Sequence, residues 1–114
     1  MGAPAAGAVV LVRFPFSDLS QTKLRPAVVL ANAGRGDWIL CQVTSQAYSD
    51  ERAVPLRSSD FASGSLRVTS FARPSKLFTA SQELFAADVA VLTPASLSGL
   101  VEAVVALLRS AVSR

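Results

Sequence analysis

The sequence of 114 residues contains no histidine and only one cysteine, Cys41. Without histidine the chain lacks the usual general base, the commonest metal ligand and any Ser-His or Cys-His nucleophile pair. A single cysteine excludes an intrachain disulfide and, with scattered carboxylates, a structural zinc site. Any catalysis must therefore use Arg, Lys, Asp, Glu, Ser, Thr or Tyr. Cys41 lies in an apolar segment, and we expect it to be a small buried hydrophobic residue.

Charged residues are also scarce, at 17% of the chain against 51% hydrophobic residues. This composition is typical of a globular protein and excludes a disordered one. The mean hydropathy of +0.42 is high for a small soluble monomer, so either the core is large or apolar surface is buried against a partner. A homodimer is the simplest such assembly. The net charge of +3 is a mild bias towards polyanions, which composition alone assigns to an ordinary basic surface.

Long apolar runs are absent as well. The longest, such as residues 103–108, fall far short of the roughly 20 residues that cross a bilayer, so we expect no membrane-spanning segment. The first twelve residues have no basic region before their apolar run, which argues against a signal peptide. A cytoplasmic protein is the default expectation.

Short apolar segments separated by turn residues predict a mainly β fold. Thr93 is a good N-cap and Pro94 suits the first helical position, and the apolar residues that follow recur at helical spacing. We expect a disordered tail at 1–6 and a single domain at 7–114, built as a small β-barrel closed by a C-terminal helix. The predicted strands are 8–14, 26–30, 38–44, 53–56, 66–70 and 75–78. A helical turn is predicted in 58–65, and residues 86–92 are predicted to be either a strand or a turn.

Arg25 stands directly before Pro26, at the junction of a polar loop and an apolar strand. Proline fixes its own φ and biases the preceding residue towards extended backbone, so the guanidinium projects from a defined point. A guanidinium stays charged and binds phosphate oxygens in a bidentate manner. By itself, however, an Arg-Pro dipeptide more often marks only the start of a strand beside a solvated arginine.

Two further segments carry groups suited to nucleic acid. The segment "VTSQ" at 43–46 places two hydroxyls and an amide at a strand end, where they suit phosphates or bases, although a plain polar terminus has the same composition. The segment "SFARPSK" at 70–76 interleaves Arg73 and Lys76 with Phe71, a mixture that suits single-stranded nucleic acid. A core phenylalanine beside a charged turn explains the second segment equally well. Phe16 and Tyr48 lie in loops, where they are free to meet a ligand.

In their order and spacing, these pieces resemble the MazF/PemK family of toxins from bacterial type II toxin–antitoxin systems. The resemblance rests on "GAVVLVRFPFSD", "KLRPAVVLAN", "DWILCQVTSQ", "GSLRVTSFARPSKLFT" and the final helix that opens with Thr-Pro. It implies an SH3-like β-barrel, a homodimer, an acidic antitoxin as partner, and a metal-independent endoribonuclease without cofactor that cuts single-stranded RNA at short sequences. The 2′-hydroxyl of RNA is then the nucleophile, and the products are a 2′,3′-cyclic phosphate and a 5′-hydroxyl.

The resemblance also implies roles for individual residues. Arg25 matches the family's catalytic arginine, and Thr44, with Ser45 beside it, matches the hydroxyl residue at the end of the third strand. The loop at 15–24 is expected to arch over the RNA. The general base stays open between Asp18, Glu51 and water, because the strand that carries an Asp-Gln pair in some members has Ala72 and Arg73 here. The residues expected to bind RNA are Phe16, Ser17, Asp18, Lys23, Gln46, Tyr48, Arg73 and Lys76.

Two other functions fit the same features. One is a toxin on the same fold that binds a protein target such as gyrase, as CcdB does, since a fold does not settle a function. The pairing of Arg25 with Thr44 argues against it, because that pairing belongs to the nuclease branch. The other is a non-catalytic RNA-binding module, in which Arg25 would contribute to binding alone.

Overall fold

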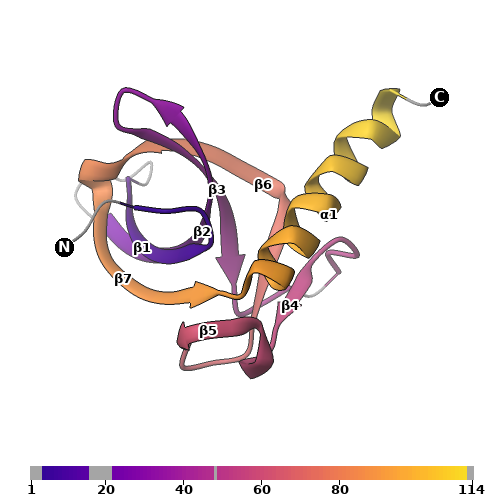
Figure 1. Cartoon of the computed structure of the whole chain (residues 1–114), viewed down its shortest axis with the longest axis horizontal. Helices are drawn as coiled ribbons and strands as arrows, with labels where there is room; N and C mark the ends of the chain where they lie inside the picture. Colours follow the sequence, from indigo (N-terminus) through magenta and orange to yellow (C-terminus); the bar gives the residue numbers. More distant parts are fainter. Residues whose placement is uncertain (1–3, 16–21, 48, 113–114) are drawn as a thin grey trace.

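The computed structural model describes residues 4–15, 22–47 and 49–112. Seven strands, two short 3-10 helices and one α-helix lie within these residues (Figure 1). The strands are β1 (Ala8–Pro15), β2 (Thr22–Gly34), β3 (Asp37–Thr44), β4 (Val54–Leu56), β5 (Phe61–Gly64), β6 (Ser70–Ser81) and β7 (Phe85–Leu92). The 3-10 helices are Ser58–Asp60 and Gln82–Leu84, and α1 is Pro94–Val112.

The strands form one antiparallel sheet in the order β4-β6-β3-β2-β1-β7-β5. The sheet curls on itself into a half-barrel, and α1 leaves from one side of it (Figure 1). The expected SH3-like fold, mainly β with a C-terminal helix, is confirmed. The segment 86–92, which the sequence left between strand and turn, is a strand.

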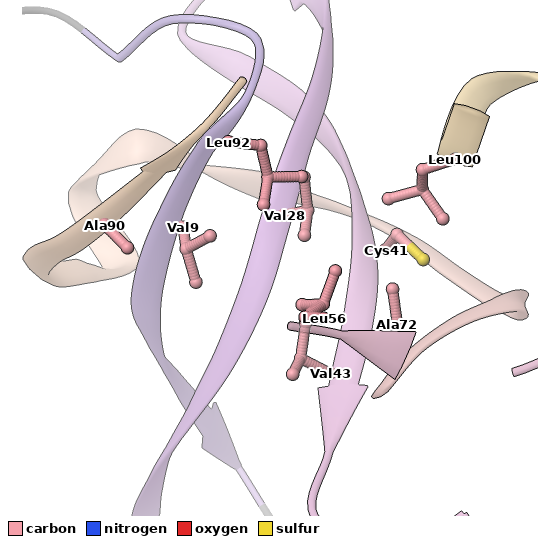
Figure 2. Packing of buried hydrophobic residues seen from close by; sticks show 9 residues of the cluster. All are labelled: Val9, Val28, Cys41, Val43, Leu56, Ala72, Ala90, Leu92 and Leu100. Carbon is pink, nitrogen blue, oxygen red and sulfur yellow. The ribbon is translucent and has the colours of Figure 1, made fainter. Parts of the chain in front are cut away.

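Apolar residues fill both faces of the central strands. Alternation along β1 and β2 sends Val9 and Val28 to one face and Val10 and Val29 to the other, and all four are fully buried. Cys41 belongs to the first face, as expected for a buried hydrophobic residue. Figure 2 shows this face, with Leu100 of α1 beside Cys41 and Ala72.

Two strand predictions are wrong. Residues 66–69 form no strand, and the segments on either side of Pro74 belong to one continuous strand, β6. Pro74 is tolerated because the β3–β6 register shifts there: Cys41 pairs with Leu77, whereas Val43 pairs with Ala72. The four residues 73–76 therefore bulge out of the ladder, where a missing N–H breaks no regular hydrogen bond.

The predicted start of the helix is confirmed. The Thr93 hydroxyl accepts a hydrogen bond from the Ser96 N–H at 3.1 Å, and the Ser96 hydroxyl donates to the Asp60 carboxylate at 2.6 Å. Only Leu100 and Val104 of α1 are buried. Farther along, Leu108 is 58% exposed, because the second half of the helix projects beyond the sheet (Figure 1).

By length and composition, α1 meets the requirement for a membrane span, with a mean hydropathy of 1.6 and 11% of its apolar window buried. Length and composition alone do not show a span, so the expectation that no segment crosses a membrane stays a prediction. A search for uninterrupted apolar runs does not detect this helix, because Ser, Gly and Glu102 interrupt a segment that is apolar on average. Leu100 packs into the core cluster of the sheet and Val104 is also buried, so α1 is anchored on the domain along one side.

Candidate functional site

Arg25 lies on β2, in the part of that strand that only β1 pairs. It faces Val12 of β1, and the pairing of β2 with β3 begins at Ala27. Pro26 is thus not the first residue of the strand, as the sequence suggested, but its fifth. Proline is accommodated because this stretch of β2 is a sheet edge on the β3 side. Lys23, two residues before Arg25, shares a face of the strand with it.

The end of β3 supplies the hydroxyl groups. The β2–β3 pairing starts at Ala27 and Gln42, and beyond it lie Arg25 of β2 and Thr44, the last residue of β3. The Thr44 hydroxyl accepts a hydrogen bond from the Gln46 N–H at 3.0 Å. This local bond fixes the threonine side chain and turns the chain at Ser45, as serine and threonine turns commonly do.

These residues meet in one hollow of about 360 Å³, which we call the cation hollow. It brings together Arg25, Thr44, Ser45 and Gln46, as the sequence predicted. Among the described residues that line it, none carries a carboxylate, and two carry a guanidinium. Its lining is Leu24, Arg25, Pro26, Val43, Thr44, Ser45, Gln46, Leu66, Arg67, Val68 and Ser70.

The second guanidinium belongs to Arg67, which sequence reasoning missed. It was assigned to a strand at 66–70, but the segment 65–69 lies outside the ladder and forms a wall of the hollow. A signal was present: Gly64 and Ser65 before the arginine, and Thr69 and Ser70 after it, are typical of a loop. A cation within such a loop is a better candidate for phosphate than one within a strand.

Arg73 is held away from the cation hollow. Its Nε donates a hydrogen bond to the Asp50 carboxylate at 2.6 Å, forming an ion pair. That bond, followed by one from the Arg52 N–H, lowers the pKa of Asp50. On the other side, the Cys41 thiol donates to the Arg73 carbonyl at 3.1 Å. The bulge that carries Arg73 is therefore tied to both the core and the 45–53 loop.

A second polar hollow of about 520 Å³ surrounds this ion pair. Gln46 lines it as well as the cation hollow, so the two are neighbours. Glu51, one of the carboxylates considered as general base, also lies here. The lining is Gln46, Ala47, Ser49, Asp50, Glu51, Arg52 and Arg73.

The remaining predicted residues are dispersed. Lys76 is exposed in the β6 bulge and lines neither of these hollows. The other predictions lie outside the residues that the structure describes: Phe16, Ser17, Asp18 and Tyr48.

Several solved structures have a similar fold. The MazE-MazF complex (Form III) from Deinococcus radiodurans has a TM-score of 0.75 at 22% identity, covering 94% of this chain and 97% of that chain. MazF (Form I) from the same organism has a TM-score of 0.70 at 25% identity, with 95% and 98% covered. An endoribonuclease from a mycobacterial species has a TM-score of 0.69 at 20% identity, with 95% and 93% covered.

Comparisons of the sequence itself give one match. No curated protein matches the chain significantly. One family model does, described as the PemK-like, MazF-like toxin of type II toxin–antitoxin systems, and it matches residues 5–108. Because that match spans nearly the whole sequence, the chain belongs to the PemK-like, MazF-like toxin family.

Proposed function

We propose that this protein is an endoribonuclease toxin that cuts single-stranded RNA at specific short sequences, without a metal ion. The observation that carries the proposal is the cation hollow, in which Arg25 and Arg67 meet the hydroxyls of Thr44 and Ser45. Guanidinium and hydroxyl donors on one wall match the oxygens of a phosphodiester. The family match and the structural likeness to a mycobacterial endoribonuclease support the same conclusion. Messenger RNA in the cytoplasm is the proposed substrate.

The reaction needs few groups from the protein, because RNA carries its own nucleophile. The 2′-oxygen attacks the adjacent phosphorus, the bond from phosphorus to the 5′-oxygen breaks, and a 2′,3′-cyclic phosphate and a 5′-hydroxyl result. The 2′-proton passes to a base, and the leaving oxygen takes up a proton. Arg25 stabilises the negative charge that develops on the phosphorane, while Thr44 and Ser45 hold its oxygens in line.

The test of this assignment is the variant Arg25→Ala, with Arg35→Ala as its control. Arg35 is an exposed arginine in the turn between β2 and β3, outside the lining of the hollow. We expect Arg25→Ala to lose about 10²–10³-fold in cleavage rate, as for loss of one transition-state donor, while the control keeps its rate. Chelation with EDTA should leave the wild-type rate unchanged. Near-normal cleavage by a folded Arg25→Ala protein refutes the role of Arg25.

The identity of the base is open to a kinetic test. Without histidine, the acceptors are a carboxylate, such as Glu51 or Asp18, or water. A carboxylate with an ordinary pKa near 4 gives a flat single-turnover rate from pH 6 to 8, and hydroxide gives a rate that climbs steadily. A bell with both limbs between pH 5.5 and 8 contradicts both. If the profile is flat, Glu51→Gln and Asp18→Asn identify the base by converting it into a rising line.

An acidic antitoxin is the proposed regulator, as structures of MazE bound to MazF support. We place its acidic segment in the cation hollow. Of the cationic residues that the resemblance assigns to catalysis or RNA binding, Arg25 lines the hollow, whereas Arg73 already has Asp50 as partner and Lys76 lies outside. Saturating antitoxin should displace a non-cleavable RNA from the toxin. Simultaneous binding of both contradicts a shared site.

A homodimer is the proposed assembly. The far half of α1 leaves Leu108 and Val112 58% and 81% exposed, an apolar surface that a second copy of the chain would cover. Sedimentation at micromolar concentration should give about twice the chain mass of 11.9 kDa. A stable monomer refutes the assembly.

A further inference from the structure

An apolar hollow of about 560 Å³ lies next to the cation hollow and has no role in the chemistry above. It is formed between β4, the start of β6 and the segment 65–69. Two half-buried phenylalanines, Phe61 and Phe71, belong to it. We call it the aromatic hollow; its lining is Pro55, Leu56, Arg57, Ser58, Phe61, Ser65, Leu66, Arg67, Val68, Thr69 and Phe71.

The two hollows share a wall. Leu66, Arg67 and Val68 line both of them, so the Arg67 guanidinium stands at their common boundary. The pairing of β3 with β6 gives the same neighbourhood independently, because Thr44 of the cation hollow is directly opposite Phe71 of the aromatic hollow. Opposed residues of an antiparallel pair have Cα atoms about 4.5–5.5 Å apart.

A cationic site beside an aromatic site matches a nucleic acid strand, in which each phosphate has a base next to it. A phosphate bound in a cationic site places the neighbouring base within one nucleotide of it, and single-stranded RNA is read by bases splayed out onto aromatic side chains. Arg57 and Arg67 add positive charge to the rim of the aromatic hollow, which complements the phosphates on either side of such a base.

We propose that the aromatic hollow binds one nucleobase of the RNA, the base next to the phosphate held by Arg25 and Arg67. Phe71 and Phe61 provide the stacking surface, and Arg67 binds the phosphate that joins the two subsites. This inference rests on the proposed function and assigns part of its sequence selectivity to a place in the fold.

The experiment crosses a protein variant with a missing base. Sequencing the 5′ ends of cleaved RNA first defines the cut site, and a short RNA with a 2′-deoxy nucleotide at that site then binds without being cut. Single abasic nucleotides are placed in turn at each position flanking the cut. For wild-type protein we expect one position to weaken binding by about 5- to 150-fold, the range for loss of one stacked base.

The variant Phe71→Leu keeps an apolar side chain but removes the aromatic face. It should weaken binding of the intact RNA and reduce the abasic penalty at that one position to less than about threefold, while penalties elsewhere stay unchanged. This coupling is specific to contact between the two groups, because separate sites give additive losses. If Phe71→Leu fails to fold, Phe61→Leu provides the same test from the other side of the hollow.

Arg67 is tested through its charge. Arg67→Gln should raise KM and reduce the slope of log affinity against log salt by about 1, as expected for loss of one phosphate contact. Arg35→Gln removes the same charge from the β2–β3 turn and should leave the slope unchanged. Equal slopes for wild type and Arg67→Gln contradict the phosphate contact.

The outcomes distinguish failure of the base site from failure of the proposed endoribonuclease function. If wild-type protein neither binds nor cuts the RNA, the proposed function is wrong. If it does both and Arg25→Ala abolishes cleavage, but no abasic position couples to Phe71 or Phe61, then the function stands and the base site is overturned. A coupling found at a position far from the cut also overturns it, because the shared wall allows only a neighbouring nucleotide.

Discussion

Gly64 lets β5 approach β7 more closely than any residue with a side chain allows. It pairs with Ala90 and has a φ of +67°, in the left-handed region that L-residues rarely adopt. A Cβ placed there collides with the Val89 carbonyl oxygen and lies 2.8 Å from the Ala90 Cα. Both obstacles are backbone atoms, which have no rotamer through which to move aside. Gly64→Ala must therefore separate the two strands.

The expected loss has two parts. The left-handed backbone costs an alanine about 1–2 kcal/mol, and an overpacked methyl group in a tight contact adds about 1–3 kcal/mol. Gly64→Ala should therefore lower the free energy of unfolding by about 2–5 kcal/mol. At roughly 4 °C per kcal/mol for a chain of this size, Tm falls by about 8–20 °C.

Gly36 provides a matched control. Its φ is +83°, also left-handed, but a Cβ there meets no atom of the described structure within 4 Å. Gly36→Ala should thus show only the backbone part, a fall in Tm of about 4–8 °C. Thermal unfolding of both variants, followed by circular dichroism, isolates the collision as the difference between them. Equal losses would refute the argument that the β5–β7 approach requires glycine.

Asp50→Asn should strengthen RNA binding and steepen its salt dependence by about one phosphate contact, because the substitution removes a carboxylate and releases Arg73. Filter binding at two salt concentrations measures both effects. Unchanged binding contradicts the prediction. The lowered pKa of Asp50 means that its stabilising contribution is fully present above the unfolded-state value of 3.8 and is lost as the pH falls through the lower folded-state value. In urea unfolding, the advantage of wild type over Asp50→Asn should therefore shrink only below about pH 4; a constant advantage down to pH 2.5 argues against the linkage. Burial raises the pKa of the Cys41 thiol to about 11, so a thiol reagent at pH 8 should modify unfolded protein and leave the native protein unmodified. Gly99→Ala should stabilise the protein by about 1 kcal/mol, since a Cβ there meets open space within a helix; a lower Tm contradicts this.

Features set by neighbouring residues could be predicted from the sequence. The helix start at Thr93 and Pro94 depends on a local cap, and the buried strands β1 and β3 depend on their own apolar side chains. The opening of β2 at Thr22 could not be predicted in this way. Its polar residues join the sheet through backbone pairing with β1, which a pattern of hydrophobic residues does not reveal.

The residues of the candidate site also differ in whether the local sequence could reveal them. Arg25 and Thr44 could be named because the motifs around them resemble those of the toxin family, and the fold brings both into the cation hollow. Arg67 could not, because it reaches the hollow only when residues 65–69 leave the ladder. The partnership of Arg73 with Asp50 was equally hidden, since it joins residues 23 apart through the β6 bulge.

The wall of residues 66–68 between the two hollows has a consequence for how such toxins diversify. Arg25 and Thr44 stand on β2 and β3, whereas the wall belongs to no strand, and loop positions tolerate changes of length and composition more readily than strand positions do. On the proposed function, changes at Leu66 and Val68 would alter the base subsite while Arg25, Arg67 and Thr44 stay in place. Replacing residues 65, 66, 68 and 69 while keeping Arg67 is therefore, on the proposed function, a route to altered RNA preferences.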